Sequence, residues 1–172
     1  MNSESGAAVD SGASPPFFPV SIRKFAVLEC CTFGAYGLFW FYRNWQLAQR
    51  RDQLDILPFW RAFFTFFFCY AFFERVRDYP TSTGRPALPA GALAAGFIVL
   101  CLAADLPDPF GLVSIFACLF LLPVQAAANR VNAEVAPDHD RNSRFTAWNW
   151  LTVVVGGSVL VLAVIGAFLP PV

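Results

Sequence analysis

Charged residues are scarce in this sequence. Only 14% of the 172 residues are Asp, Glu, Lys or Arg, and 57% are hydrophobic, whereas a typical soluble domain has about 25% charged and 45–50% apolar residues. Mean hydropathy is +0.53, and twelve basic residues balance twelve acidic ones. The composition predicts a membrane protein. Its expected partners are membrane lipids, together with a second copy of itself or another membrane protein, and not nucleic acid.

Motifs for catalysis or metal binding are also missing. The sequence has no Walker loop, no GxGxxG, no HExxH and no Ser-His-Asp arrangement with supporting motifs. Its single histidine, His139, stands between Asp138 and Asp140, and adjacent residues do not converge easily on one ion. The five cysteines fall within apolar runs, as small buried hydrophobes do. We therefore predict no catalytic residue, no cofactor and no metal site.

The first twenty residues resemble neither a signal peptide nor a folded segment. They have no basic start and no apolar run, so they are not a cleavable signal peptide. Ser, Gly, Ala and Pro dominate them, which is typical of disordered segments. The sequence therefore predicts a disordered tail over 1–20 and one helical membrane domain over 21–172.

Long apolar runs, by contrast, are abundant. Crossing a bilayer takes about 20 apolar helical residues. The last three runs meet this requirement, whereas the first contains Glu29 and the second is short and contains Arg61. We predict an all-α integral membrane bundle with three full spans and an N-terminal Phe/Trp-rich re-entrant or interfacial hairpin. The alternative is five spans. The five runs cover residues 24–42, 58–73, 87–104, 109–128 and 145–170.

The distribution of basic residues favours three spans. Cytoplasmic flanks are enriched in Lys and Arg. With three spans and a cytoplasmic N-terminus, all twelve basic residues are cytoplasmic and the C-terminus is periplasmic. Five spans would move Arg43, Arg50, Arg51 and Arg61 outside. In the three-span arrangement the basic flanks contact anionic lipid.

Several aromatic residues stand near the ends of apolar segments. Trp and Tyr gather at membrane–water interfaces, and Arg can anchor a helix end there. We expect interfacial anchoring from seven residues: Trp40, Tyr42, Arg43, Trp45, Trp60, Trp148 and Trp150.

Glu29 is an ionisable residue inside an apolar run, which is costly and is by default a functional hypothesis. It is five residues from Lys24, and so shallow enough to reach the interface. In an antiparallel hairpin the start of the first segment lies beside the end of the second. We therefore predict an ion pair between Glu29 and Arg75.

Polar residues recur on one face of the fourth segment. Gln125, Asn129 and Asn132 have helical i, i+4 and i+7 spacing, and Asn149 and Thr152 begin the fifth segment at a similar expected depth. Such residues either join helices, with bonds worth about 0.6 kcal/mol each on average, or line a polar pocket. The pocket would hold a lipid headgroup or a small anion on the cytoplasmic side.

The stretch CTFGAYGLFWFYRNW resembles the first segment of a group of small bacterial multi-pass membrane proteins of unknown function. The matching residues are Phe33, Gly34, Tyr36, Phe39, Trp40, Phe41 and Tyr42. The resemblance implies an all-helical fold in the bacterial inner membrane and supplies no catalytic residue. The expected function is a non-enzymatic accessory or scaffold role with anionic-lipid contacts. The alternative is a small carrier or ligand-binding protein with its polar pocket between the fourth and fifth segments.

Overall fold

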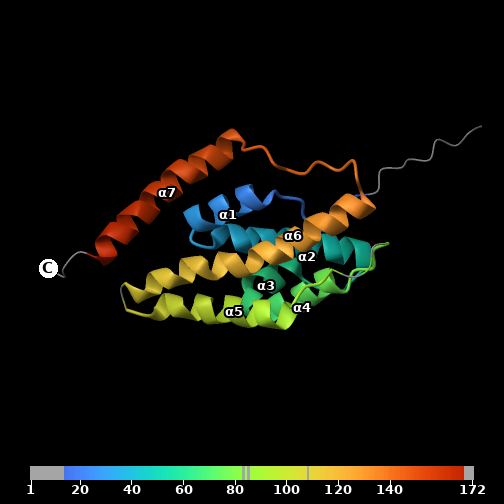
Figure 1. Ribbon diagram of the computed structural model, residues 1–172, viewed down its shortest axis with the longest axis horizontal. Coiled ribbons are helices and arrows are strands. Elements are labelled where there is room, and N and C mark those ends of the chain that lie inside the picture. Colours follow the sequence, from blue (N-terminus) through green and yellow to red (C-terminus); the bar gives the residue numbers. More distant parts are fainter. Residues whose placement is uncertain (1–13, 83, 85, 108, 169–172) are drawn as a thin grey trace, which may run out of the picture.

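The structure is a computed structural model that describes residues 14–82, 84, 86–107 and 109–168. Over these residues the chain is all-α, with seven α-helices, two short 3₁₀-helices and no strand (Figure 1). The α-helices are α1 (Ile22–Cys31), α2 (Ala35–Asp52), α3 (Pro58–Phe63), α4 (Thr65–Arg77), α5 (Ala90–Leu102), α6 (Cys118–Val135) and α7 (Ala147–Ala167). The 3₁₀-helices are η1 (Ala103–Asp105) and η2 (Phe110–Ala117).

The first apolar segment is a hairpin of two helices. The chain reverses after α1, where Phe33 and Gly34 have φ angles of 50° and 88°. Thr32 joins both helices, because its hydroxyl donates to the Leu28 carbonyl at 2.7 Å and accepts from the Tyr36 N–H at 2.9 Å. With only 10 residues in α1, about 15 Å of helix, this segment does not cross a bilayer as one helix.

The second apolar segment is also broken. At Phe64 the backbone leaves helical geometry (φ −92°, ψ 38°), which separates the six residues of α3 from the thirteen of α4. Three phenylalanines of these two helices are largely exposed: Phe59, Phe63 and Phe67, at 59%, 60% and 73%. Each early segment is therefore divided into two helices, whereas the expected hairpin paired the first segment with the second.

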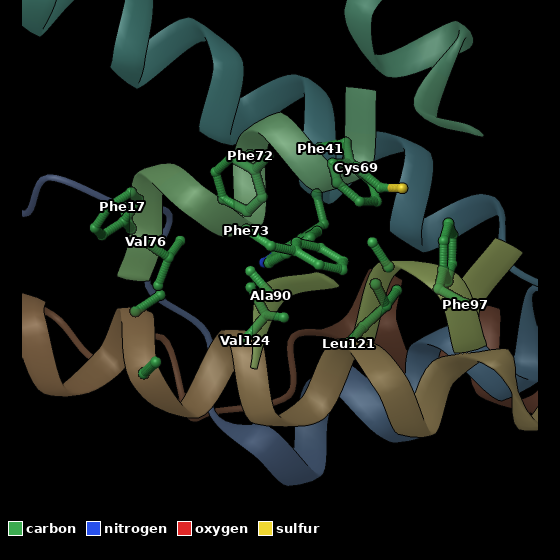
Figure 2. Packing of buried hydrophobic residues seen from close by; sticks show 14 of the residues in the cluster. Phe17, Phe41, Cys69, Phe72, Phe73, Val76, Ala90, Phe97, Leu121 and Val124 are labelled. Atoms are coloured by element: carbon green, nitrogen blue, oxygen red, sulfur yellow. The ribbon is translucent and has the colours of Figure 1, made fainter. Parts of the chain in front are cut away.

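The core lies between α2, α4, α5 and α6 and is rich in aromatic rings (Figure 2). The Phe72 ring meets Trp40, Phe41 and Trp45 edge to face, with ring centroids 5.1, 5.7 and 5.8 Å apart. Edge-to-face pairs add about 0.5–1.5 kcal/mol each beyond area burial. Trp40 and Trp45 are 0% exposed. These two residues, expected among the headgroups, instead pack inside the protein.

Residues 14–20 pack against the bundle as an extended segment. Phe17 and Val20 are 1% and 0% exposed. The Phe17 N–H donates to Asn132 Oδ1 at 3.0 Å, and Asn132 Nδ2 donates to the Phe17 carbonyl at 2.9 Å. This part of the chain therefore differs from the predicted disordered tail, because amide side chains satisfy its buried backbone. Residues 1–13 of that tail lie outside the described residues.

Two helices are long and apolar enough to cross a membrane, Phe110–Val135 (η2 with α6) and Ala147–Ala167 (α7). They correspond to the predicted segments 109–128 and 145–170, of which 169 and 170 lie outside the described residues. The remaining predicted span, 87–104, forms the shorter apolar helix Ala90–Asp105. α7 packs on α1 and lies apart from the rest of the bundle (Figure 1).

Candidate functional site

The polar face of α6 faces the extended segment 14–20. Gln125 is fully buried, and its amide nitrogen donates to the Val20 carbonyl at 3.2 Å and to Asn129 Oδ1 at 2.8 Å. Its oxygen accepts from the Trp40 indole N–H. Asn129 also donates to the Val20 carbonyl, at 2.9 Å. This face thus holds the segment in place.

Asn149 and Thr152 do not join that cluster. Asn149 and Thr146 cap the start of α7 by bonding each other's backbone N–H, at 3.1 and 3.3 Å. The Thr152 hydroxyl donates to the Trp148 carbonyl at 2.9 Å within the same helix. The five residues predicted to form one pocket therefore divide into two unconnected sets.

Lys24 helps explain this separation. Its Nζ donates to Asn142 Oδ1 and to the Arg144 carbonyl, both at 2.8 Å. These contacts hold the connection 136–146 over the start of α1. As a result, α7 packs on α1, away from the polar face of α6.

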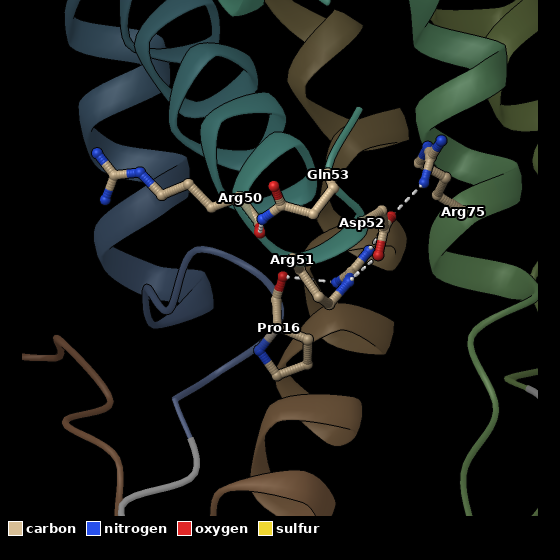
Figure 3. Close-up of polar contacts among 6 residues, drawn as sticks. All are labelled: Pro16, Arg50, Arg51, Asp52, Gln53 and Arg75. Atoms are coloured by element: carbon tan, nitrogen blue, oxygen red, sulfur yellow. Dashed lines mark hydrogen bonds and ion pairs between the residues drawn. The ribbon is translucent and has the colours of Figure 1, made fainter. Parts of the chain in front are cut away.

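Arg75 pairs with Asp52 and does not pair with Glu29. Its Nη1 lies 2.6 Å from Asp52 Oδ2, while Arg51 contacts the same carboxylate at 2.7 Å (Figure 3). The hydrogen bond from Arg51, followed by the positive charges of Arg51 and Arg75, lowers the pKa of Asp52. Glu29 is near the chain reversal, and Asp52 ends the helix that leads away from it. This geometry explains why the predicted Glu29–Arg75 pair is not formed.

The remaining predicted interface residues have varied surroundings. Tyr42 and Arg43 are half-buried, and the Arg43 guanidinium lies 5.7 Å from the centroid of the Phe18 ring. Trp60, Trp148 and Trp150 are 49%, 77% and 57% exposed. Only these three tryptophans have the exposure that contact with headgroups requires.

Glu29 is buried beside Gly37, in the first turn of α2. It is 5% exposed, and its Oε2 atom has no hydrogen-bond partner among the described residues. A Cβ atom at Gly37 would lie 2.5 Å from Oε1 and 3.0 Å from Oε2. Only glycine at position 37 therefore leaves room for the carboxyl group in this position.

The Glu29 carboxyl lies at the wall of a cavity of about 430 Å³. The cavity runs between the α1–α2 turn, α3, α4, the end of α5 with η1, and the junction of η2 with α6. Its rim reaches the surface, since Phe33, Leu38 and Phe63 line it and are 48%, 46% and 60% exposed. This volume is within the range of small-molecule sites, about 300–1,000 Å³.

Apolar side chains form most of the cavity wall. The two hydroxyls in the wall donate to nearby backbone carbonyls, Thr65 of α4 to Ala62 of α3 at 2.6 Å and Ser114 to Gly111 within η2 at 2.8 Å. Glu29 is the one ionisable carboxyl among the described lining residues, and its Oε2 is unpaired. The arrangement can hold an apolar molecule and offer it one carboxyl group.

Sequence reasoning identified Glu29 but not the cavity. The available signal was the spacing of Gly34 and Gly37, one helical turn apart and just after an acidic residue in an apolar run. Among the described residues, no three His, Cys, Asp or Glu side chains are grouped so that they could hold a metal ion. The site rests on the geometry of this chain, since no protein-family model, curated protein or solved structure matches it.

Proposed function

We propose that this chain is an integral protein of the bacterial inner membrane that binds one lipophilic molecule in the cavity beside Glu29 and catalyses no reaction. In this arrangement α5, η2 with α6, and α7 cross the bilayer. The α1–α2 and α3–α4 hairpins enter from the cytoplasmic side, where the N-terminus lies, and the C-terminus is periplasmic. The observation that carries the proposal is the cavity itself, with its apolar wall and single unpaired carboxyl oxygen.

The exposure of α7 supports a membrane location. None of its residues is buried, and Val154 and Leu162 are 63% and 68% exposed. In water, apolar surface costs about 25 cal/mol per Å², and a patch as long as this helix is unusual on a soluble monomer. Lipid tails remove that cost. The exposed phenylalanines of α3 and α4 fit the same environment.

The depth of the cavity supports entry from the bilayer. Gly156, near the middle of α7, lies against the carbonyl of Cys31 at the end of α1. The α1–α2 turn therefore lies at the mid-depth of a candidate span. Because the cavity begins at this turn, its rim opens among acyl chains, and a lipophilic molecule can enter sideways.

Filling the cavity tests the proposal. Ala104 lines the cavity and is exposed at its edge, so Ala104→Phe adds a ring there at little cost to folding. We expect mass spectrometry of the protein in mild detergent to find a copurified apolar molecule, reduced at least tenfold in Ala104→Phe. Leu102→Phe is the matched control, because Leu102 is 54% exposed and outside the lining. Equal occupancy in both variants, or no copurified molecule in the unchanged protein, would refute ligand binding in this cavity.

An accessory role with anionic-lipid contacts is the second candidate. Arg61 and Arg75 lie 4.6 and 5.8 Å from the centroid of the Trp45 ring. Arg75 has Asp52 as its partner, whereas no carboxylate among the described residues forms an ion pair with Arg61. Desolvation, followed by the charge of Arg75, lowers the pKa of Arg61. A lipid phosphate placed here would relieve the repulsion between the two guanidinium groups.

Lipid selectivity tests this second candidate. A basic residue near an anionic surface contributes about 1 kcal/mol, so Arg61→Gln is expected to weaken phosphatidylglycerol binding about fivefold. Native mass spectrometry can measure this binding against phosphatidylcholine, whose retention should not change. An equal loss of both lipids would indicate a packing defect and would count against a headgroup contact.

A further inference from the structure

We propose that the cavity recognises lipophilic amines, with the ligand's ammonium group paired to the Glu29 carboxylate and its apolar body against the cavity wall. This inference rests on the proposed binding function and names the chemical class of the ligand. Its starting point is Glu29, which lines the cavity and whose buried Oε2 atom has no hydrogen-bond partner among the described residues.

A carboxylate buried among apolar side chains without a partner costs free energy. Burying an ionised group without a partner costs several kcal/mol even after the surroundings relax. A ligand that supplies a positive charge and N–H donors offsets that cost, because a hydrogen bond to a charged group contributes about 1.5–3 kcal/mol. Binding energy from such a ligand is therefore concentrated at Glu29.

Three basic side chains of the α1–α2 hairpin have partners elsewhere, and one of them, Arg43, donates to Gln46 Oε1 at 3.2 Å. Lys24, five residues earlier on α1, donates to Asn142 Oδ1 and to the Arg144 carbonyl. Arg51, at the far end of α2, pairs with Asp52 and donates to the Pro16 carbonyl (Figure 3). No described ion pair includes Glu29. The cation has to come from the ligand.

The wall around the carboxyl selects against other ligand classes. Phe33, Phe41, Phe66 and Phe97 all line the cavity, and aromatic faces attract cations in addition to apolar groups. No basic side chain is among the described lining residues, so a fatty acid would face Glu29 with no compensating charge. A neutral alcohol could donate one hydrogen bond to Oε2 but could not neutralise it.

Three probes of equal chain length test the inference: n-octylamine, which is an ammonium ion at pH 7, n-octanol and octanoate. Their affinities are measured by calorimetry on the full chain in an uncharged detergent, with empty micelles subtracted. We expect octylammonium to bind at least tenfold more tightly than octanol, and octanoate not to bind. Glu29→Gln keeps the size of the side chain and should reduce octylammonium affinity at least tenfold while leaving octanol within twofold.

Gly37→Ala provides a second variant that retains Glu29. Its added Cβ would displace the end of the Glu29 side chain, so octylammonium affinity should fall while octanol affinity holds. This variant keeps the inference testable if Glu29→Gln fails to fold. Equal affinities for octylammonium and octanol in the unchanged protein would overturn amine recognition and leave apolar binding standing. Failure of all three probes to bind would count against both proposals.

Discussion

Replacing Gln125 with leucine is expected to lower the melting temperature of the purified protein by roughly 10 °C. Leucine fills a similar volume but removes the acceptor of the Trp40 N–H and the donor to Asn129 Oδ1. Each buried group left unpaired costs about 1–3 kcal/mol, which suggests about 3–4 kcal/mol in total. At about 2–4 °C per kcal/mol for a chain of this size, a thermal scan in detergent would detect the loss.

Gln46→Leu is the matched control for this prediction. Gln46 is half-buried on α2, donates to the Tyr42 hydroxyl at 2.7 Å and accepts from Arg43 at 3.2 Å. Water can replace both partners there, so its melting temperature should change by no more than about 2 °C, as for most surface substitutions. If the Gln125→Leu protein had the same melting temperature as the Gln46→Leu control, the polar face of α6 would not be what holds the segment 14–20.

The polar face of α6 was visible in the sequence, but its partner was not. The spacing of Gln125, Asn129 and Asn132 predicted one helical face, and they do share one. Their partners are backbone groups of residues 17–20, within a stretch whose composition suggests disorder. Backbone carbonyls are the same in every sequence, so no residue pattern reveals that a particular segment will pair with side-chain amides.

The hairpins were easier to anticipate than the surroundings of their tryptophans. Glu29 and Arg61 mark the first two apolar segments, and the structure divides each of these segments into two helices. From the same composition, Trp40 and Trp45 were predicted to lie among the lipid headgroups, whereas both pack around Phe72. Because both α2 and α4 are rich in aromatic residues, composition alone cannot separate the lipid-facing rings from those at the helix contact.

The second large expected effect is that of a substitution at Gly156 on the packing of α7 against α1. A Cβ atom at this position would overlap the Cys31 carbonyl oxygen. Backbone at the end of α1 cannot yield as a side chain can, so Gly156→Val should force α7 away from α1. Gly166 is on the same helix with nothing within 4 Å of its Cβ position, so Gly166→Val is a control with the same added volume.

A crosslink can report the distance between the two helices. The Cβ position of Gly157 lies 3.8 Å from Cys31 Sγ, so Gly157→Cys should form a disulfide with Cys31 under mild oxidation, detected by mass spectrometry of the linked peptides. In the protein that carries Gly157→Cys, we expect the added substitution Gly156→Val to reduce this crosslink at least tenfold. The added substitution Gly166→Val should leave the crosslink unchanged. Equal crosslinking in both variants would mean that α7 does not pack on α1 through its glycines. In lipid, where apolar burial gives helices little reason to associate, close packing at small residues is the main force that can hold α7 in place. The loss of one such contact is therefore expected to release the helix.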